Sequence, residues 1–353
     1  MEPLPAPSPT VEVNMAEPLP EAEPEIGEAL AGYLADEGIA VLGDLAYDAV
    51  RRTAGGVSLT VRRNGRDETV TAEQILVATG RTANTEGLGL AEAGIAQTPT
   101  GAIAVDDRMR TSRPGVYAAG DVTGRDQFVY MAAYGARLAA RNALNGDSLR
   151  YDNRTMPGVV FTDPQVGSVG LTEARARAAG HDVRTSVLTL DNVPRALAAR
   201  DTRGLIKLVA DRSTRRLLGA HILAPEGADS IQTAAMAIRC DLTIDDLSET
   251  IFPYLTTVEG LKLAAQTFTV GAQRVVVGQA SAGQQSGAFV YSAALANQLA
   301  GINSQVLRSY SSLDIYNADG GTLQVGSSIL GSLTLDAGAI NVNGAGGTVL
   351  VEA

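Results

Sequence analysis

Apolar and polar positions alternate along the first part of the chain in a pattern that predicts one helix and one strand. Ile26, Leu30 and Leu34 recur at the spacing of a single helix face. Gly38 is expected to end that helix, since glycine readily adopts the left-handed conformation found at many helix C-termini. The apolar residues 39–42 then predict a strand.

Two strand-like segments, 57–62 and 68–71, flank Asn64-Gly65. Both residues of this dipeptide tolerate positive φ, so the pattern predicts a β-hairpin with a two-residue turn. The apolar run Ile75–Ala78 follows and predicts a short buried strand.

Beyond Tyr151 the strands occur in runs beside helices, which is typical of an α+β domain with an antiparallel sheet covered on one face. Thr172 can cap the start of the first helix, and Gly180 can end it. The expected strands are 159–161, 183–190, 205–209 and 217–223, and the expected helices are at about 173–179, 228–239 and 245–251.

From Thr269 onward the chain is rich in glycine and poor in charge. Short apolar segments separated by Gly, Asn, Ser and Asp predict strands there. The pattern favours a β-solenoid or a stack of short hairpins, although the spacing is too irregular to define a repeat. The segments are 323–325, 333–335, 340–342 and 349–351.

Composition adds a few exclusions for this chain of 353 residues, which is long enough for two domains. Half of the 14 prolines lie within residues 1–24, which predicts a disordered arm. The net charge of -11 argues against nucleic-acid binding, because an acidic surface repels phosphates. No apolar run reaches the length of ~20 residues that a membrane helix needs, and no secretory segment is evident, so a cytoplasmic protein is expected.

Cysteine and histidine content excludes further classes of site. One cysteine, Cys240, cannot form an internal disulfide, a Cys-x-x-Cys redox pair or a cysteine-rich zinc site. We expect it to be a buried packing residue. Only two histidines, His181 and His221, are present, so a histidine-based metal site is not expected either.

The sharpest local motif is an apolar stretch, 115–119, that ends in Gly120-Asp121 and leads into a helical pattern from about Gln127. It predicts a strand followed by a turn and a helix. A carboxylate at a strand end can accept hydrogen bonds from ligand hydroxyls, and a helix N-terminus favours an electron-rich group. By itself, such a motif is more often an ordinary strand and tight turn.

Two further motifs accompany it. Val77-Ala78-Thr79-Gly80-Arg81 lies upstream, and Phe161-Thr162-Asp163-Pro164 followed by Val169-Gly170-Leu171-Thr172-Glu173 lies downstream. In this order and spacing, the three motifs resemble those of the flavin-dependent pyridine nucleotide-disulfide oxidoreductases. The resemblance extends over about residues 17–268.

Within that family, four segments resemble the mercuric reductases. They are 127–130, 190–197, 201–204 and 252–264. The resemblance implies reduction of Hg(II) to Hg(0) by NADPH through FAD, and a homodimer formed through residues 151–268.

Tyr254 distinguishes this chain from the disulfide reductases, which place a histidine there and a glutamate at the position of Glu259. A phenol with a pKa of about 10 is a poor proton shuttle near neutral pH. Reduction of Hg(II) yields no dithiol that must be protonated, so the histidine is dispensable. The resemblance implies that Tyr254 and Glu259 enter the active site of the partner subunit, with Tyr254 on the path of Hg(II).

For the cofactor, the resemblance implies that Asp121 binds the ribityl chain of FAD and that the following turn and helix face the flavin pyrimidine ring. The implied cofactor-binding residues are Gly80, Arg81, Gly120, Asp121, Gln127, Phe128 and Val129.

Several parts of the family pattern are missing. The chain has neither of the two glycine fingerprints that hold FAD and NADP(H), nor the redox-active cysteine pairs. We therefore expect an enzyme fragment that is inactive or nearly so, joined to a tail that weakly resembles the repeats of secreted bacterial adhesins. Two alternatives remain: a non-catalytic dimerising protein with an adhesive β tail, and a dihydrolipoamide dehydrogenase-like fragment, against which Tyr254 and residues 190–197 count.

The expected fold class is α/β plus α+β, with truncated nucleotide domains, an α+β dimerisation domain and a β-rich tail. The expected divisions are a disordered arm (1–24), a partial NAD(P)-binding domain (25–80), the later part of an FAD-binding domain (81–150), the dimerisation domain (151–268) and the tail (269–353). Because a nucleotide domain cut partway exposes a sheet edge, residues 25–150 are expected to be less stable than 151–268.

Overall fold

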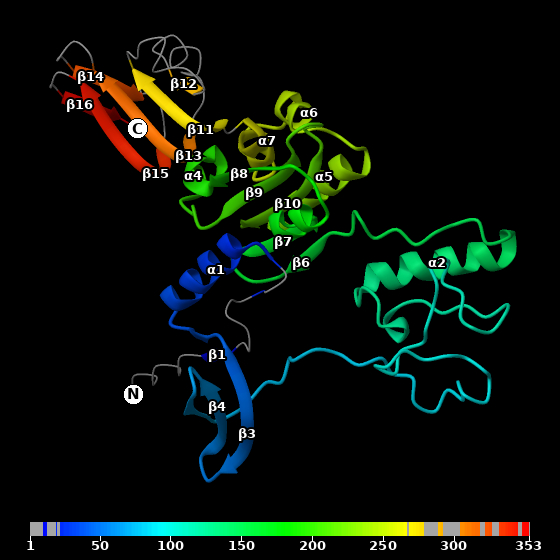
Figure 1. The fold of residues 1–353 in the computed structure, drawn as a ribbon. Coiled ribbons are helices and arrows are strands. Elements are labelled where there is room, and N and C mark those ends of the chain that lie inside the picture. Colours follow the sequence, from blue (N-terminus) through cyan, green and yellow to red (C-terminus); the bar gives the residue numbers. More distant parts are fainter. Residues whose placement is uncertain are drawn as a thin grey trace. The chain divides into compact units, whose positions relative to one another are not determined.

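The computed structural model describes residues 10–12, 19 and 22–266, followed by strands within 268–352. By its internal contacts the chain divides into two compact units, residues 1–46 with 157–353, and residues 47–156. Figure 1 shows the elements of both units, and each unit is described by itself.

A five-stranded antiparallel sheet is the centre of the first unit, with the order β6-β7-β10-β9-β8. Four of its strands confirm the sequence prediction, whereas β7, which contains two glycines among its six residues, was not predicted. The strands are β6 (Gly158–Val160), β7 (Gln165–Gly170), β8 (Val183–Thr189), β9 (Leu205–Asp211) and β10 (Leu217–Ala224).

Five helices accompany this sheet in the part of the chain that is described, besides the N-terminal helix on its other face. The Thr172 hydroxyl caps the first of them by accepting a hydrogen bond of 3.2 Å from the backbone N–H of Arg175, and Gly180 follows that helix with φ 88°. Three of the helices were predicted, whereas the short α4 and α7 were not. They are α3 (Glu173–Ala178), α4 (Pro194–Ala199), α5 (Gly227–Arg239), α6 (Ile244–Glu249) and α7 (Glu259–Gln266).

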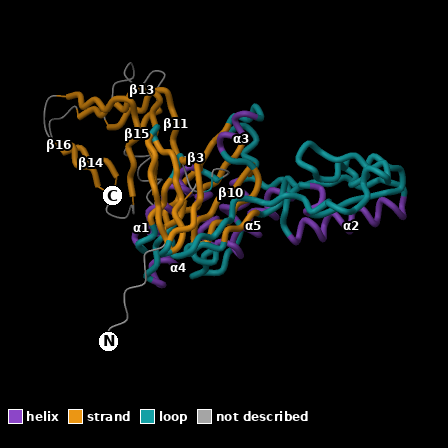
Figure 2. Tube along the Cα trace, turned by 90° about the horizontal axis from the view of Figure 1, so that it is seen from below, coloured by secondary structure: helices purple, strands orange, loops and turns teal. Residues whose placement is uncertain are grey.

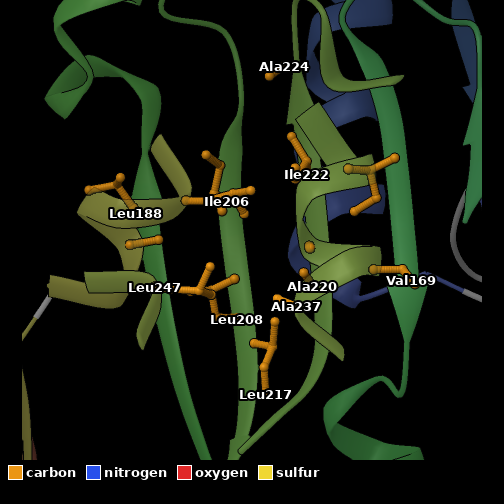
Figure 3. Packing of buried hydrophobic residues seen from close by; sticks show 14 of the residues in the cluster. Val169, Leu188, Ile206, Leu208, Leu217, Ala220, Ile222, Ala224, Ala237 and Leu247 are labelled. Carbon is orange, nitrogen blue, oxygen red and sulfur yellow. The ribbon is translucent and has the colours of Figure 1, made fainter. Parts of the chain in front are cut away.

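The main core lies between one face of the sheet and helices α5, α6 and α7. Ile206, Leu208 and Ile222 point into it from the two central strands (Figure 3) and are fully buried. Gly260 lets α7 approach closely, because a Cβ there would lie 2.5 Å from Cδ1 of Ile206.

The opposite face of the sheet is covered by α1 (Pro24–Asp36), so the prediction of a sheet covered on one face only was wrong. Ile26 and Leu30 pack there against Leu223 and its neighbours. Because side chains alternate across a strand, a strand such as β10 with nearly every residue buried must be covered on both faces. That sequence pattern does not show which helices provide the cover.

Charged side chains are buried beside that apolar contact. Nζ of Lys207 lies 2.9 Å from Oε2 of Glu23, 2.8 Å from Oε1 of Glu25 and 3.2 Å from Oε2 of Glu173. Lys207 and Glu23 are almost inaccessible, with 4% and 2% of their side chains exposed. Burial of these charges is tolerated because each is paired and hydrogen-bonded.

The structure describes parts of the segment 1–24 that is predicted to be a disordered arm. The strand β1 (Thr10–Glu12) pairs in parallel with β2 (Ala40–Leu42), and α1 begins at Pro24 directly after the buried Glu23. Backbone hydrogen bonds between β1 and β2, and the ion pair between Glu23 and Lys207, thus hold parts of this proline-rich segment in place. Most other residues of this segment lie outside the described residues.

The second unit begins with a three-stranded sheet in the order β3-β4-β5, made of β3 (Leu45–Thr53), β4 (Gly56–Arg63) and β5 (Arg66–Ala72). Arg63 pairs with Arg66 across the turn, and Asn64 and Gly65 have φ of 50° and 73°. The predicted hairpin is confirmed.

The two strands predicted further on in this unit do not form. Leu76 and Val77 are 90% and 71% exposed, and residues 115–119 contribute only an isolated bridge between Arg110 and Tyr117. A strand needs a neighbour for its backbone hydrogen bonds, and none pairs with 75–78 among the described residues of the unit. The helix predicted after Gln127 is present as α2 (Val129–Asn145), which ends at Gly146 with φ 84°.

The C-terminal part consists of strands in parallel pairs. β11, β13 and β15 lie side by side (Figure 2), with β12 on the outer side of β11, and β14 pairs with β16. Parallel pairs cannot be joined by tight hairpin turns, so these pairs do not form the predicted stack of hairpins. The strands are β11 (Phe268–Gly278), β12 (Phe289–Tyr291), β13 (Ser304–Asn317), β14 (Thr322–Gly326), β15 (Ser332–Gly344) and β16 (Thr348–Glu352).

Candidate functional site

The turn at Gly120-Asp121 is shaped by glycine. Gly120 has φ 82° and ψ -163°, and a Cβ there would lie 3.1 Å from Cβ of Ala132 on α2. The Thr123 hydroxyl donates a hydrogen bond of 2.8 Å to the Gly120 carbonyl and closes a single 3-10 turn, Asp121–Thr123. The turn therefore holds Asp121 close to α2 while half of its side chain, 51%, stays exposed.

Arg81 connects this turn to the segment that enters α2. Its Nη1 donates a hydrogen bond of 3.0 Å to the Gln127 carbonyl and lies 3.8 Å from Oδ2 of Asp121. Gly80 precedes it with φ 114°. The guanidinium and the carboxylate are both solvent-accessible, so their mutual attraction is weak and both remain able to bind a ligand.

The first turn of α2 lies next to these two charged groups. Its N-cap residue, Phe128, provides no side-chain hydrogen bond to the helix N-terminus, and its ring stacks on Tyr130 with 5.3 Å between centroids. Val129 is 84% exposed. The positive end of the helix dipole is thus left to interact with a ligand rather than with a capping side chain.

These groups line one cleft of about 560 Å³. Six of the seven predicted cofactor-binding residues meet in it, and Gly80 does not line it. Ala119, Val122 and Ala132, which sequence reasoning did not single out, complete its wall: the lining residues are Arg81, Ala119, Gly120, Asp121, Val122, Gln127, Phe128, Val129 and Ala132. Hydroxyl groups of a ligand can donate hydrogen bonds to Asp121. A partial negative charge on the ligand can face Arg81 and the N-terminus of α2.

A larger hollow of about 830 Å³ in the same unit lies within residues 82–92 and also contacts Gln97. Its charged groups are the carboxylates of Glu86 and Glu92, and it brings together no oppositely charged pair. The smaller cleft is therefore the better ligand site.

Tyr254 and Glu259 lie in the other unit, on the connection between α6 and α7. Tyr254 is 73% exposed, and it lies between the exposed Ile251 and Leu255. Glu259 is the first residue of α7, and its Oε2 is buried without a hydrogen-bond partner in the described part of the chain. A buried carboxylate oxygen without a partner costs free energy, so Glu259 stands out among the carboxylates described.

Three groups near this connection were missed because sequence spacing gives no sign of them. The Thr257 hydroxyl donates a hydrogen bond of 2.7 Å to Oε2 of Glu226, and Oε1 of Glu226 lies 3.6 Å from Nη2 of Arg195. These residues come from three separate segments, so only the fold brings them together.

Cys240 and His221 occupy different environments. Cys240, expected to be buried, is exposed at the end of α5. His221 is buried against α1, and its Nε2 lies 3.2 Å from the Leu171 carbonyl. Among the described residues, no group of three His, Cys, Asp or Glu side chains is placed to hold a metal ion. A membrane-crossing helix is likewise not found among them.

Comparison with protein families accounts for this arrangement. The model of the pyridine nucleotide-disulphide oxidoreductases matches residues 9–140, and that of their dimerisation domain matches residues 156–265. This chain has the pyridine nucleotide-disulphide oxidoreductase fold. Members of this family use FAD and NAD(P)H. The cleft at Asp121 lies within the first match, and Tyr254 and Glu259 lie within the dimerisation domain.

Curated relatives that this chain resembles are mercuric reductases. That of Acidithiobacillus ferrooxidans is 49% identical over 247 residues, 70% of this chain and 44% of the relative. That of Streptomyces lividans is 47% identical over 247 residues (70% and 52%), and that of Bacillus cereus 45% over 250 (71% and 40%). The chain spans about half the length of these relatives.

Solved structures agree with the fold. The Cu(II) complex of the HOCl-induced flavoprotein disulfide reductase RclA from Escherichia coli matches with a TM-score of 0.66 and 29% identity, covering 72% of this chain and 57% of that one. LpdA from Mycobacterium tuberculosis matches with a TM-score of 0.66 and 29% identity, covering 73% and 55%.

Proposed function

We propose that this chain is part of a mercuric reductase, an enzyme that reduces Hg(II) to Hg(0) with NADPH through FAD in the cytoplasm, and that the chain alone is inactive or nearly so. The observation that carries the proposal is the 44% to 49% identity to mercuric reductases over about 70% of the chain. Tyr254, at the position where disulfide reductases place a histidine, supports the same choice.

The cleft at Asp121 fits one end of FAD. Asp121 would accept hydrogen bonds from the ribityl hydroxyls, and Arg81 and the first turn of α2 would stabilise negative charge on the pyrimidine ring. Gly120 fits as well, since its missing Cβ keeps the turn close to α2. When bound, FAD supplies the electrons for reduction.

The chain offers no counterpart for the pyrophosphate of FAD or for NADP(H), because no glycine fingerprint occurs in its sequence. It also has a single cysteine, so it cannot supply the redox-active pair. We expect its own residues to bind and orient the flavin end, and Tyr254 and Glu259 to act on Hg(II) in a partner subunit.

Flavin binding by the cleft is tested by titrating the purified full chain into riboflavin and FAD and following flavin fluorescence. We expect weak binding that Asp121→Asn reduces about tenfold, since charge-assisted hydrogen bonds are lost. Asp67→Asn is the matched control, because Asp67 also pairs with an exposed arginine, Arg62, at 2.9 Å but lies on the β4–β5 hairpin. Equal loss in both variants, or no binding by the wild type, contradicts the assignment.

The claim of inactivity has its own test, the oxidation of NADPH in the presence of Hg(II) and FAD. We expect no turnover above the protein-free rate. Robust turnover by the purified chain would show that other residues replace the missing fingerprints and cysteines.

A second candidate is a non-catalytic protein that dimerises through residues 151–268. The single cysteine favours it, together with exposed apolar side chains on the dimerisation domain such as Phe161, Met236 and Ile251. Size-exclusion chromatography with light scattering measures the oligomeric state. A homodimer is expected under both candidates, and a clean monomer would argue against both the preserved interface and any shared active site.

A further inference from the structure

The connection that carries Tyr254 and Glu259 is held by a side chain from outside it. Glu226 lies between β10 and α5 with φ 61°, and its Oε2 accepts the hydrogen bond of 2.7 Å from the Thr257 hydroxyl. Thr257 is 7% exposed. A hydroxyl so buried gains more from a charged acceptor than an exposed one does, because water cannot replace the bond.

The same threonine organises the start of α7. Its carbonyl accepts a hydrogen bond of 3.0 Å from the backbone N–H of Gly260, so the residue is held on both its side chain and its backbone. Glu259 lies inside the turn closed by the bond between Gly260 and Thr257, and its Oε2 is buried without a partner in the described part of the chain. Fixing Thr257 therefore limits where the Glu259 carboxylate can point.

The other oxygen of Glu226 faces the segment 190–197, one of the four segments whose sequence resembles the mercuric reductases. Nη2 of Arg195 on α4 lies 3.6 Å from Oε1 of Glu226. A small cavity of about 30 Å³ is lined by residues of the same segment together with Glu226, Thr257 and three neighbouring residues. Val193 also lies close to α7, since a Cβ at Gly260 would be 3.6 Å from its Cγ2.

We propose that Glu226 is a positioning residue that couples the segment 190–197, through Arg195 and Thr257, to the connection bearing Tyr254 and Glu259. The role as part of a mercury site rests on the proposed function, whereas the coupling itself does not. Glu226 holds Thr257 as a charged acceptor, and its other oxygen faces Arg195 in a partly exposed pair. The carboxylate thereby joins three segments that the chain separates.

Hydrogen exchange in the full chain, measured by mass spectrometry without flavin, NADPH or Hg(II), tests the coupling. Thr257→Val keeps the shape but removes the hydroxyl, and we expect exchange of the amides in 252–262 to become about tenfold faster. Thr257→Ser restores the hydroxyl and is expected to exchange like the wild type. Glu226→Gln keeps an acceptor but loses the charge, and about threefold faster exchange is expected.

Two comparisons make the test decisive. The amides of α3, in the same domain, report any global loss of stability. The variant Glu249→Gln is the control for removing the charge of an exposed carboxylate near the connection. A second readout is the fluorine signal of 3-fluorotyrosine at position 254, identified by its loss in Tyr254→Phe. We expect it to move toward the unfolded shift in Thr257→Val and to return in Thr257→Ser.

Unchanged exchange in 252–262, equal acceleration in α3, or failure of the serine variant to restore protection would overturn the proposal. All variants are compared in one oligomeric state, checked by light scattering. Since no cofactor or mercury is present, a negative exchange result leaves the proposed function standing, and failure of mercury reduction in a complete enzyme leaves the coupling standing.

Discussion

Two apolar runs of this chain have similar sequences and opposite structures. Leu205–Asp211 forms the inner strand β9, with almost every residue buried, whereas Ile75–Ala78 forms no strand and leaves Leu76 90% exposed. The first run pairs with β8 and β10 and is covered by helices, while the second has no pairing strand among the described residues of its unit. Apolar sequence makes a strand possible, and neighbours decide whether it forms.

The same contrast extends to whole regions. The dimerisation domain has a core of 18 buried residues that joins a sheet to the helices α4 to α7. In residues 47–156, the cluster around α2 contains three buried residues, Met109, Leu138 and Ala139. The cleft at Asp121 thus belongs to the region with the smaller core, and Tyr254 and Glu259 to the region with the larger one.

The largest effect expected from this comparison is the loss of stability when a core side chain is shortened. Ile222→Ala in β10 should lower the free energy of unfolding by about 2–5 kcal/mol, because a fully buried side chain leaves a cavity. Leu76→Ala should change it by less than about 0.5 kcal/mol, since that side chain is already in water. Urea unfolding of both variants measures the difference, and equal costs would mean that residues 75–78 are covered in solution.

Limited proteolysis compares the regions directly. We expect cleavage within 47–156 to be at least about tenfold faster than within 157–266, because local opening needs less free energy where fewer apolar contacts must break. Mass spectrometry of early fragments locates the cuts. First cleavage inside the dimerisation domain would reverse the expected order of stabilities.

The pH dependence of the dimerisation domain should come partly from His221. Burial lowers the pKa of His221 below its usual 6.5, although the Leu171 carbonyl and the nearby Glu23 favour its charged form. The unfolded chain then binds the extra proton first, so stability present above pH ~6.5 is lost as the pH falls, by up to about 1.4 kcal/mol per pH unit. Lys207 and Glu25 face the same group.

Urea unfolding between pH 7.5 and 5.5 measures this slope. His221→Gln should flatten it, because glutamine keeps a donor for the Leu171 carbonyl but does not titrate. His181→Gln is the control, since His181 is partly exposed and pairs with Asp211 at 3.4 Å. The Glu173 carboxyl, whose pKa is lowered by Arg177 and Lys207 against the effect of burial, acts in a separate and more acidic range. A slope unchanged by His221→Gln would exclude this account.

The smallest effect concerns a helix cap. Thr243 and Asp246 form a reciprocal capping box on α6, with hydrogen bonds of 3.1 Å and 2.8 Å. Thr243→Ala should cost about 1 kcal/mol and Thr243→Ser little, since serine keeps the oxygen. Thermal unfolding followed by circular dichroism measures both. The helix α2 in the other region has no such side-chain cap. If the alanine and serine variants lost the same stability, the Thr243 hydroxyl would not be what stabilises α6, and caps would not contribute to the difference between the regions.

Local signals determined much of this protein. The Asn64-Gly65 hairpin, the cap at Thr172 and four strands of the dimerisation domain follow from short-range rules about φ, hydrogen bonding and periodicity. Residues of the cleft could be named from three motifs because their spacing matches that of the family. The geometry of Gly120 and Asp121 is local as well, since one 3-10 turn sets it.

Tertiary structure decided the rest. Only the fold places α1 on the second face of the sheet, buries Lys207 among Glu23, Glu25 and Glu173, and brings Glu226 to Thr257. These contacts join residues far apart in the chain, and their free energy depends on burial and pairing, which no local pattern encodes. For the same reason, Ile75–Ala78 reads as a strand in sequence but remains unpaired among the described residues of its unit.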